Sequence, residues 1–442
     1  DNDIHFCRQT LLLDPDAFAG FGTGLRVEKP TGQGPVAAPA ILALVVPVLG
    51  HLAPLLWALM LFWAALVAWR ARVLHPRALA LLGVTLAVSL VIRLVLARTG
   101  PVNFVEYERV FPPGPDDIAR LAYAGQAYLL GPLFSLFGSS FDMVFGLNAF
   151  LLPLLCLGVW SLSMKMTKDS RASLAAVLLV GLNPLVLRLS ASASETFGFA
   201  VLAVIFVDLL VDAFDDWRRG WAVALLTPLV LVYRPEGLLL AAPALLLAVA
   251  AYFTGSRRRP SAAVLAPLAL VAAWFGLFGQ LYSGLSFPRI SWALLGGNTT
   301  GFLQEMVDPR YHSPLLTICL LAPLALVSAS FRRLPWSAGL AIAASAFCLL
   351  LVAVWCIQGP EDNLAFGSAR YLVMAEPWLA VCSALVFAHL LNKGKTWAGI
   401  AFGLFVLLTV PHMGLLTEES NMQKEFDFMV AAAERIPEHA LV

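Results

Sequence analysis

Four carboxylates lie close together in one polar stretch of an otherwise apolar chain. Glu106 and Glu108 precede a turn rich in proline and glycine, and Asp116 and Asp117 follow it. A carboxylate beside a membrane can act as a general base toward an acceptor hydroxyl, or it can hold a divalent metal. The alternatives are that Asp116 caps a following helix and that the glutamates pair with nearby arginines. The sequence therefore offers these four residues as candidate catalytic groups.

A second set of charged or polar residues recurs at the ends of later apolar segments. Its members, in chain order, are Glu195, Arg234, Glu236, Arg370 and Tyr371. Arginine binds phosphate through a planar fork of donors, and charges next to a membrane core are costly enough to suggest a function. We therefore expect this set to bind a phosphate-bearing substrate. Snorkelling of the arginines, or an internal pair between Arg234 and Glu236, is the alternative.

The composition points to a membrane protein. The chain has 442 residues, of which 60% are hydrophobic and 13% are charged. A soluble domain carries about 25% charged residues, so lipid is the simpler solvent for this chain. The net charge of +1 gives no reason to expect a nucleic-acid partner. The six cysteines show no CxxC spacing, so neither a disulfide framework nor a zinc site is expected.

Twelve apolar segments are candidate transmembrane helices, which need about 20 residues to cross the hydrocarbon core. They are 40–69, 77–97, 142–163, 172–190, 196–213, 221–233, 238–253, 262–282, 314–330, 338–356, 371–391 and 397–415. The first is long enough to break at Pro47, Gly50 or Pro54. The short segments 221–233 and 238–253 must join close to or within the membrane. The sequence therefore predicts an all-α polytopic membrane protein with about 12 transmembrane helices.

Alternate loops of this arrangement are short and basic. Their basic residues are Arg70, Arg72, Arg77, Lys165, Lys168, Arg171, Arg218, Arg219, Arg257, Arg258, Arg259, Arg332, Arg333, Lys393 and Lys395. The positive-inside rule makes these loops cytoplasmic. The candidate catalytic and phosphate-binding residues then lie on the external side, which would be periplasmic for a bacterial inner-membrane protein.

The chain divides into three parts. We expect residues 1–38 to form a polar external segment, residues 39–415 to form the transmembrane domain, and residues 416–442 to form an external tail with an amphipathic helix. Two external loops are long, at 98–141 and 283–313. Within the first, the aromatic, amphipathic stretch 119–138 suits a helix that lies in the membrane interface.

Two aspartates stand apart from the external set. Asp208 and Asp212 are four residues apart, near the predicted cytoplasmic end of their helix. We expect them to face Arg218 and Arg219, in a structural rather than a catalytic role.

In its order of features the chain resembles the GT-C glycosyltransferases. Asp116-Asp117, followed by the stretch that ends at Gly138, resembles the acidic first loop and juxtamembrane helix of that family. The stretch Tyr233–Leu238, together with Ser194-Glu195-Thr196, is similar to its middle region. Arg370-Tyr371, with Glu376-Pro377, resembles its late segment. The likeness covers about residues 77–391.

The resemblance implies a substrate and a reaction. The donor would be a sugar linked to polyprenyl phosphate, and the acceptor would be a hydroxyl of a glycan, lipid or protein. Transfer would invert the anomeric centre, with Asp116 as the base and with Arg370 and Arg234 on the departing phosphate. No cofactor is expected, and a divalent metal at the carboxylates is the alternative. The alternatives are a non-catalytic subunit of a larger membrane complex and a polytopic transporter or lipid flippase.

Overall fold

The structure is a computed structural model that describes most of the chain. It describes residues 37–97, 99–100, 125–138, 140–253, 267–269, 271–272, 292–311, 313–319, 321–322, 336–358, 370–417, 427–428 and 431. Over these residues the regular secondary structure is helical, without a β-strand. The predictions for the N-terminal segment, for residues 101–124 of the first loop and for most of the tail lie outside the described residues.

The helices follow one another with short connections where the chain is described. They are α3 (Ala37–Leu74), α4 (Pro76–Leu96), α7 (Gly125–Phe137), α8 (Phe141–Thr167), α9 (Ser170–Gly181), α10 (Pro184–Ser190), α11 (Glu195–Asp215), η1 (Trp217–Arg219), α12 (Gly220–Tyr233), η2 (Pro235–Leu240), α13 (Ala241–Phe253), α15 (Trp292–Val307), α16 (Pro314–Cys319), α18 (Trp336–Gln358), η3 (Arg370–Met374), α20 (Glu376–Lys393), α21 (Lys395–Thr409) and η4 (Val410–Leu416). This order agrees with the predicted all-α class.

Five helical stretches in the described part are long and apolar enough to cross a membrane. They are His51–Val73, Pro76–Leu96, Asp142–Thr167, Glu195–Asp215 and Lys395–Leu416, and the bent pair α9–α10 makes a sixth if it is one span. The chain is therefore an integral membrane protein, as the composition predicts. The total of twelve spans stays a prediction, because several of the predicted segments lie partly or wholly outside the described residues.

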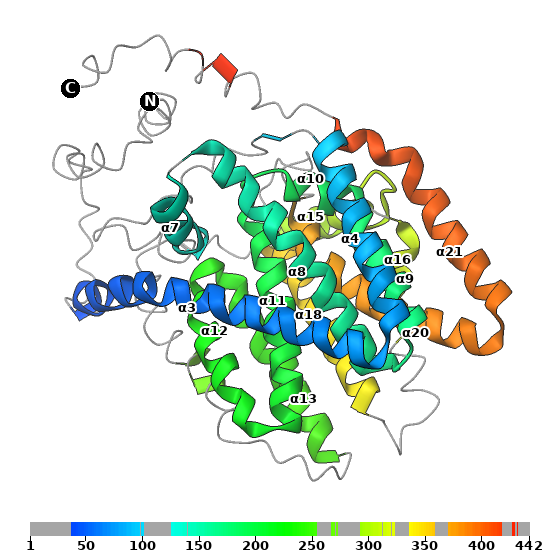
Figure 1. Cartoon of the computed structure of the whole chain (residues 1–442), viewed down its shortest axis with the longest axis horizontal. Helices are drawn as coiled ribbons and strands as arrows, with labels where there is room; N and C mark the ends of the chain where they lie inside the picture. The colour runs from blue at the N-terminus through cyan, green and yellow to red at the C-terminus, as the bar shows by residue number, and fades with distance from the viewer. Residues whose placement is uncertain are drawn as a thin grey trace.

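Helix α11 forms the centre of the bundle (Figure 1). Every residue from Glu195 to Phe214 is buried, as expected for a helix that is hydrophobic on all sides. Helices α8 and α12 pack directly against it, and α20 packs against α8 and α9. Helices α3, α4 and α21 lie at the edges and expose apolar side chains, which suits contact with lipid.

The predicted span 172–190 is bent by 60° between α9 and α10. The side chain of Asn183 caps α10 by accepting a hydrogen bond from the Val186 backbone N–H at 3.0 Å. Pro184, which has no N–H to donate, occupies the first helical position. Helix α10 therefore starts as a new helix, with its axis turned away from that of α9.

Helices α12 and α13 form the predicted short pair, joined through η2. Each has 13 or 14 residues and is about 20 Å long, less than the roughly 30 Å of a hydrocarbon core. The turn between them begins at Arg234, whose backbone is extended because the next residue is Pro235. Arg234 is only 3% exposed, so this turn lies inside the bundle.

Two details differ from the sequence prediction. Helix α3 runs unbroken from Ala37 to Leu74 despite Pro47 and Pro54, because a proline inside an apolar segment removes a hydrogen bond without ending the helix. The predicted loop 283–313 contains helix α15. Its sequence has too few apolar residues to be predicted as a transmembrane helix.

Asp208 and Asp212 form the structural cluster expected of them. Lys165 Nζ lies 2.8 Å from Asp208 Oδ1 and 2.8 Å from Asp212 Oδ1. Arg70 Nη1 reaches Asp212 Oδ2 at 3.0 Å, and Trp63 Nε1 donates to Asp208 Oδ2 at 2.9 Å. The cluster therefore joins α3, α8 and α11.

The predicted partners of this pair are only partly right. Arg219 Nη1 lies 3.2 Å from Asp212 Oδ2, as predicted. Arg218 instead donates its backbone N–H to Asp216 Oδ1. The partners on α3 and α8 are distant in sequence, so charge spacing along the chain could not indicate them.

Candidate functional site

A buried arginine bridges two glutamates at the N-terminal end of α11. Arg234 Nη1 donates to Glu195 Oε1 at 2.7 Å. Its Nε and Nη2 donate to Glu236 Oε2 and Oε1 at 3.0 and 2.7 Å, which is a bidentate pair. Glu195 and Arg234 are 1% and 3% exposed. Burying such charges is costly unless they are paired, and here Arg234 is paired with both carboxylates.

The local sequence explains why these three residues meet. Glu195 is in the first turn of α11, where the helix dipole favours a negative charge. Arg234 ends α12, which runs antiparallel beside α11, and the turn through Pro235 returns Glu236 to the same side. The pair Arg234–Glu236, the alternative considered for the sequence, is therefore formed, and Glu195 extends it.

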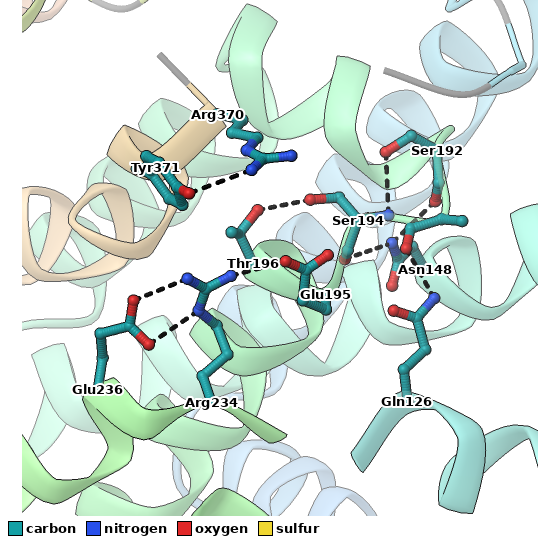
Figure 2. A network of polar contacts seen from close by, with 11 residues as sticks. Gln126, Asn148, Ser192, Ser194, Glu195, Thr196, Arg234, Glu236, Arg370 and Tyr371 are labelled. Carbon is teal, nitrogen blue, oxygen red and sulfur yellow. Dashed lines mark hydrogen bonds and ion pairs between the residues drawn. The ribbon is translucent and has the colours of Figure 1, made fainter. Parts of the chain in front are cut away.

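Arg370 and Tyr371 complete the site from η3. The Arg370 guanidinium carbon lies 4.8 Å from the centre of the Tyr371 ring, and its Nη2 donates to the Tyr371 hydroxyl at 3.1 Å. The Arg234 guanidinium carbon lies 5.4 Å from the same ring centre. Figure 2 shows Tyr371 and Arg370 above the Arg234–Glu236 pair. Both guanidinium groups therefore share one aromatic ring.

The charged side chains of the site have no net formal charge. They are Glu195, Glu236, Arg234 and Arg370. Two guanidinium groups and two carboxylates are held together, and Arg370 is 6% exposed. Arg234 is hydrogen-bonded to the two glutamates, and Arg370 donates to the Tyr371 hydroxyl. Arg370 offers guanidinium donors that suit an anion. The hydrogen-bonded group of Glu195, Arg234 and Glu236, called the triad below, lies beside it.

A short turn, Ala191–Ser194, leads into Glu195, and polar side chains from other helices hold it. Asn148 Nδ2 of α8 donates to the carbonyls of Ser192 and Ser194 at 2.8 and 3.0 Å. Gln126 Nε2 of α7 donates to the carbonyl of Ala193 at 2.7 Å. Sequence reasoning missed both amides. The available signal was a polar residue within an apolar segment, which membrane helices bury only with a partner.

A further contact ties α20 to α10. Asn183 Nδ2 donates to Glu376 Oε2 at 2.9 Å, and both side chains are buried. Glu376 belongs to the late motif cited for the family resemblance. The bond places η3, which directly precedes α20, beside the helices that carry the rest of the site.

The structure brings the five predicted phosphate-binding residues into one cluster, although they come from three distant stretches of the chain. Their roles stay predictions. The four candidate catalytic residues, Asp116, Asp117, Glu106 and Glu108, lie outside the described residues. In the part of the chain that is described, no group of three or more histidine, cysteine or acidic residues is arranged to hold a metal.

Comparison with solved structures identifies the fold. The chain is similar to ArnT from Cupriavidus metallidurans bound to undecaprenyl phosphate, with 14% identity and a TM-score of 0.50 over 80% of this chain and 68% of that one. It is also similar to the Archaeoglobus fulgidus oligosaccharyltransferase in complex with zinc and sulfate, with 14% identity and a TM-score of 0.49. There the match covers 81% of this chain and 57% of that one.

The chain therefore has the fold of the GT-C glycosyltransferases, as its sequence resemblance predicted. At this identity the likeness concerns the fold alone. No protein-family model matches the sequence, and no curated protein matches it.

Proposed function

We propose that this protein is an inverting glycosyltransferase that moves a sugar from a polyprenyl-phosphate donor to an acceptor hydroxyl on the external side of the membrane. The observation that carries the proposal is the cluster of Glu195, Arg234, Glu236, Arg370 and Tyr371 in a GT-C fold, in which Glu195 and the two arginines are buried. A cluster of this kind can bind a phosphate group through its guanidinium donors.

Arg370 is the residue proposed to bind the phosphate. Its guanidinium has a planar fork of donors, and the Tyr371 ring and hydroxyl hold it in one orientation. The similar ArnT is bound to undecaprenyl phosphate, which supports a lipid phosphate as the anion. As the sugar departs, the phosphate oxygen gains negative charge, and a fixed guanidinium stabilises that charge without reorganising.

Arg234 is proposed to orient the site rather than to bind phosphate. Its guanidinium bonds to Glu195 and Glu236 and shares the Tyr371 ring with Arg370. The triad is therefore a rigid, charge-compensated support beside the phosphate position. This assignment is narrower than the direct contact that the sequence alone suggested for Arg234.

The reaction needs one base and no redox chemistry. The acceptor hydroxyl attacks the anomeric carbon and gives its proton to a carboxylate, with Asp116 proposed first and Asp117, Glu106 or Glu108 as alternatives. The bond between the anomeric carbon and the phosphate oxygen breaks, and its electron pair leaves with the phosphate. The transition state has oxocarbenium character, as in other glycosyl transfers.

The test is sugar transfer by the full chain in vesicles that contain undecaprenyl-phosphate-linked sugars. We expect transfer by the wild type, and Asp116→Asn should lower kcat by about 10²–10⁴-fold, the usual contribution of a general base. Equal expression and an unchanged unfolding midpoint serve as the control for folding.

Other outcomes would point elsewhere. If each of the four first-loop carboxylates can be neutralised without loss, the proposed base is wrong. Lipid or substrate flux without any sugar transfer would identify a transporter or flippase. Inactivity together with copurification in a fixed stoichiometry would identify a non-catalytic subunit.

A further inference from the structure

Two adjacent residues of α7 contact the backbone on both sides of the Glu195–Arg234 pair. Gln126 donates to the carbonyl of Ala193, two residues before Glu195. Gly125 packs against Tyr233, the residue before Arg234, so closely that an added Cβ would lie 2.6 Å from Tyr233 Cα. One turn of α7 therefore contacts both segments that carry the ion pair, the turn before Glu195 and the end of α12 before Arg234.

This part of α7 is fully enclosed. Residues 125–130 are all buried, and the Gln126 side chain has no exposed surface. A buried amide bonded to a carbonyl is costly to remove, because the carbonyl is then left without that donor in an apolar surrounding. Figure 2 shows Gln126 and Asn148 on one side of Glu195, with Arg234 and Glu236 on the other.

We infer that Gln126 is a positioning residue that holds the turn before Glu195 and so fixes the Glu195–Arg234 pair beneath Tyr371. The catalytic consequence rests on the proposed function, but the structural coupling does not. Helix α7 then sets the position of the site's ion pair.

A purely structural role for Gln126 is the competing explanation, and α7 offers a matched control. Trp57 Nε1 of α3 donates to the carbonyl of Leu129 at 2.9 Å. This bond also fastens α7 by a side-chain donor and a backbone acceptor, yet it does not reach the turn before Glu195. Trp57→Phe removes that bond and keeps an aromatic ring in place.

The first experiment compares Gln126→Leu with Trp57→Phe in the vesicle transfer assay. We expect Gln126→Leu to lower kcat/KM for the undecaprenyl-phosphate-linked sugar about tenfold, since small misplacements of site groups reduce rates strongly. Gln126→Met, which keeps the length of the side chain but has no donor, should behave alike, and Trp57→Phe should change kcat/KM less than twofold. Equal losses in Gln126→Leu and Trp57→Phe would overturn the inference.

The second experiment does not depend on activity. It measures the unfolding midpoints of Gln126→Leu, Glu195→Gln and the double variant in detergent. Coupled residues give non-additive shifts, so the double variant should lose less than the sum of the single losses. Trp57→Phe combined with Glu195→Gln should be additive.

The two experiments separate the two claims. An inactive wild type with non-additive midpoints would reject the proposed transfer reaction and keep the positioning role. Additive midpoints for Gln126→Leu with Glu195→Gln would overturn the positioning role, whatever the activity of the wild type.

Discussion

At the scale of single residues, the two arginines of the site differ in what surrounds them. Arg234 makes three hydrogen bonds to two carboxylates, so its charge is compensated within the protein. Arg370 stacks on Tyr371 and donates to its hydroxyl. Two residues of one type are therefore expected to respond differently to substitution, Arg370 through substrate binding and Arg234 through folding.

Substitution of Arg370 tests this difference. Arg370→Gln removes the charge and should lower kcat/KM for the lipid donor about 10²-fold or more, because a fixed charge on the leaving phosphate is lost. Arg370→Lys keeps the charge without the planar fork and should lose less. Both values come from initial rates in the vesicle assay.

Tyr371→Phe is the control for Arg370. It keeps the ring that both guanidinium groups face and removes only the hydroxyl. A loss of only a few-fold is expected. A loss as large as that of Arg370→Gln would mean that the hydroxyl, rather than the guanidinium, carries the contact with substrate.

At the scale of elements, the site depends on close packing between α11 and α12. Gly198 lies one turn after Glu195 in α11, and a Cβ there would overlap the hydroxyl of Tyr233. Tyr233 is fully buried at the end of α12. A side chain at Gly198 would therefore push apart the two helices that bring Glu195 and Arg234 together.

Gly198→Ala should destabilise the protein by about 1–3 kcal/mol through overpacking. The measurement is the thermal unfolding midpoint in detergent. Gly403→Ala in α21 is the matched control, because an added Cβ there meets nothing within 4 Å. The control should be neutral or slightly stabilising, since alanine favours a helix more than glycine does. Equal midpoints for the two variants would contradict the packing argument.

At the scale of the whole molecule, two charged clusters lie at opposite ends of α11. One surrounds Glu195 in its first turn, and the other surrounds Asp208 and Asp212 near its last turn. The second cluster joins α3 and α8 to α11 through Arg70 and Lys165. The two ends of α11 are therefore held by separate sets of contacts. We expect substitutions in the cluster at Asp208 to lower the free energy of unfolding without a direct effect on the reaction.

Lys165→Met tests this separation. It leaves the fully buried Asp208 without its closest cation, so we expect a loss of about 3–5 kcal/mol. Adding Asp208→Asn should recover part of that loss, because the buried charge is then removed as well. The exposed Arg218→Met should have little effect, and unfolding midpoints in detergent measure all three variants.

The sequence alone determined the class of the protein and the candidate residues of one site. Apolar segments and basic loops indicate membrane helices directly, because lipid requires backbone hydrogen bonds to be satisfied within each helix. The break at Arg234-Pro235 was also predictable, because proline restricts the residue before it. The first-loop carboxylates were identified by type alone, and their roles remain predictions.

Only the tertiary structure decided which residues pair. Glu195 and Arg234 are 39 positions apart, and Arg234 meets Tyr371 only because η3 packs beside α11. The amides of Gln126 and Asn148 gain their role from the turn that they reach. Helix formation is local and follows from the types of nearby residues. The pairing of buried polar groups depends on which helices pack together, and no local pattern in the sequence records that.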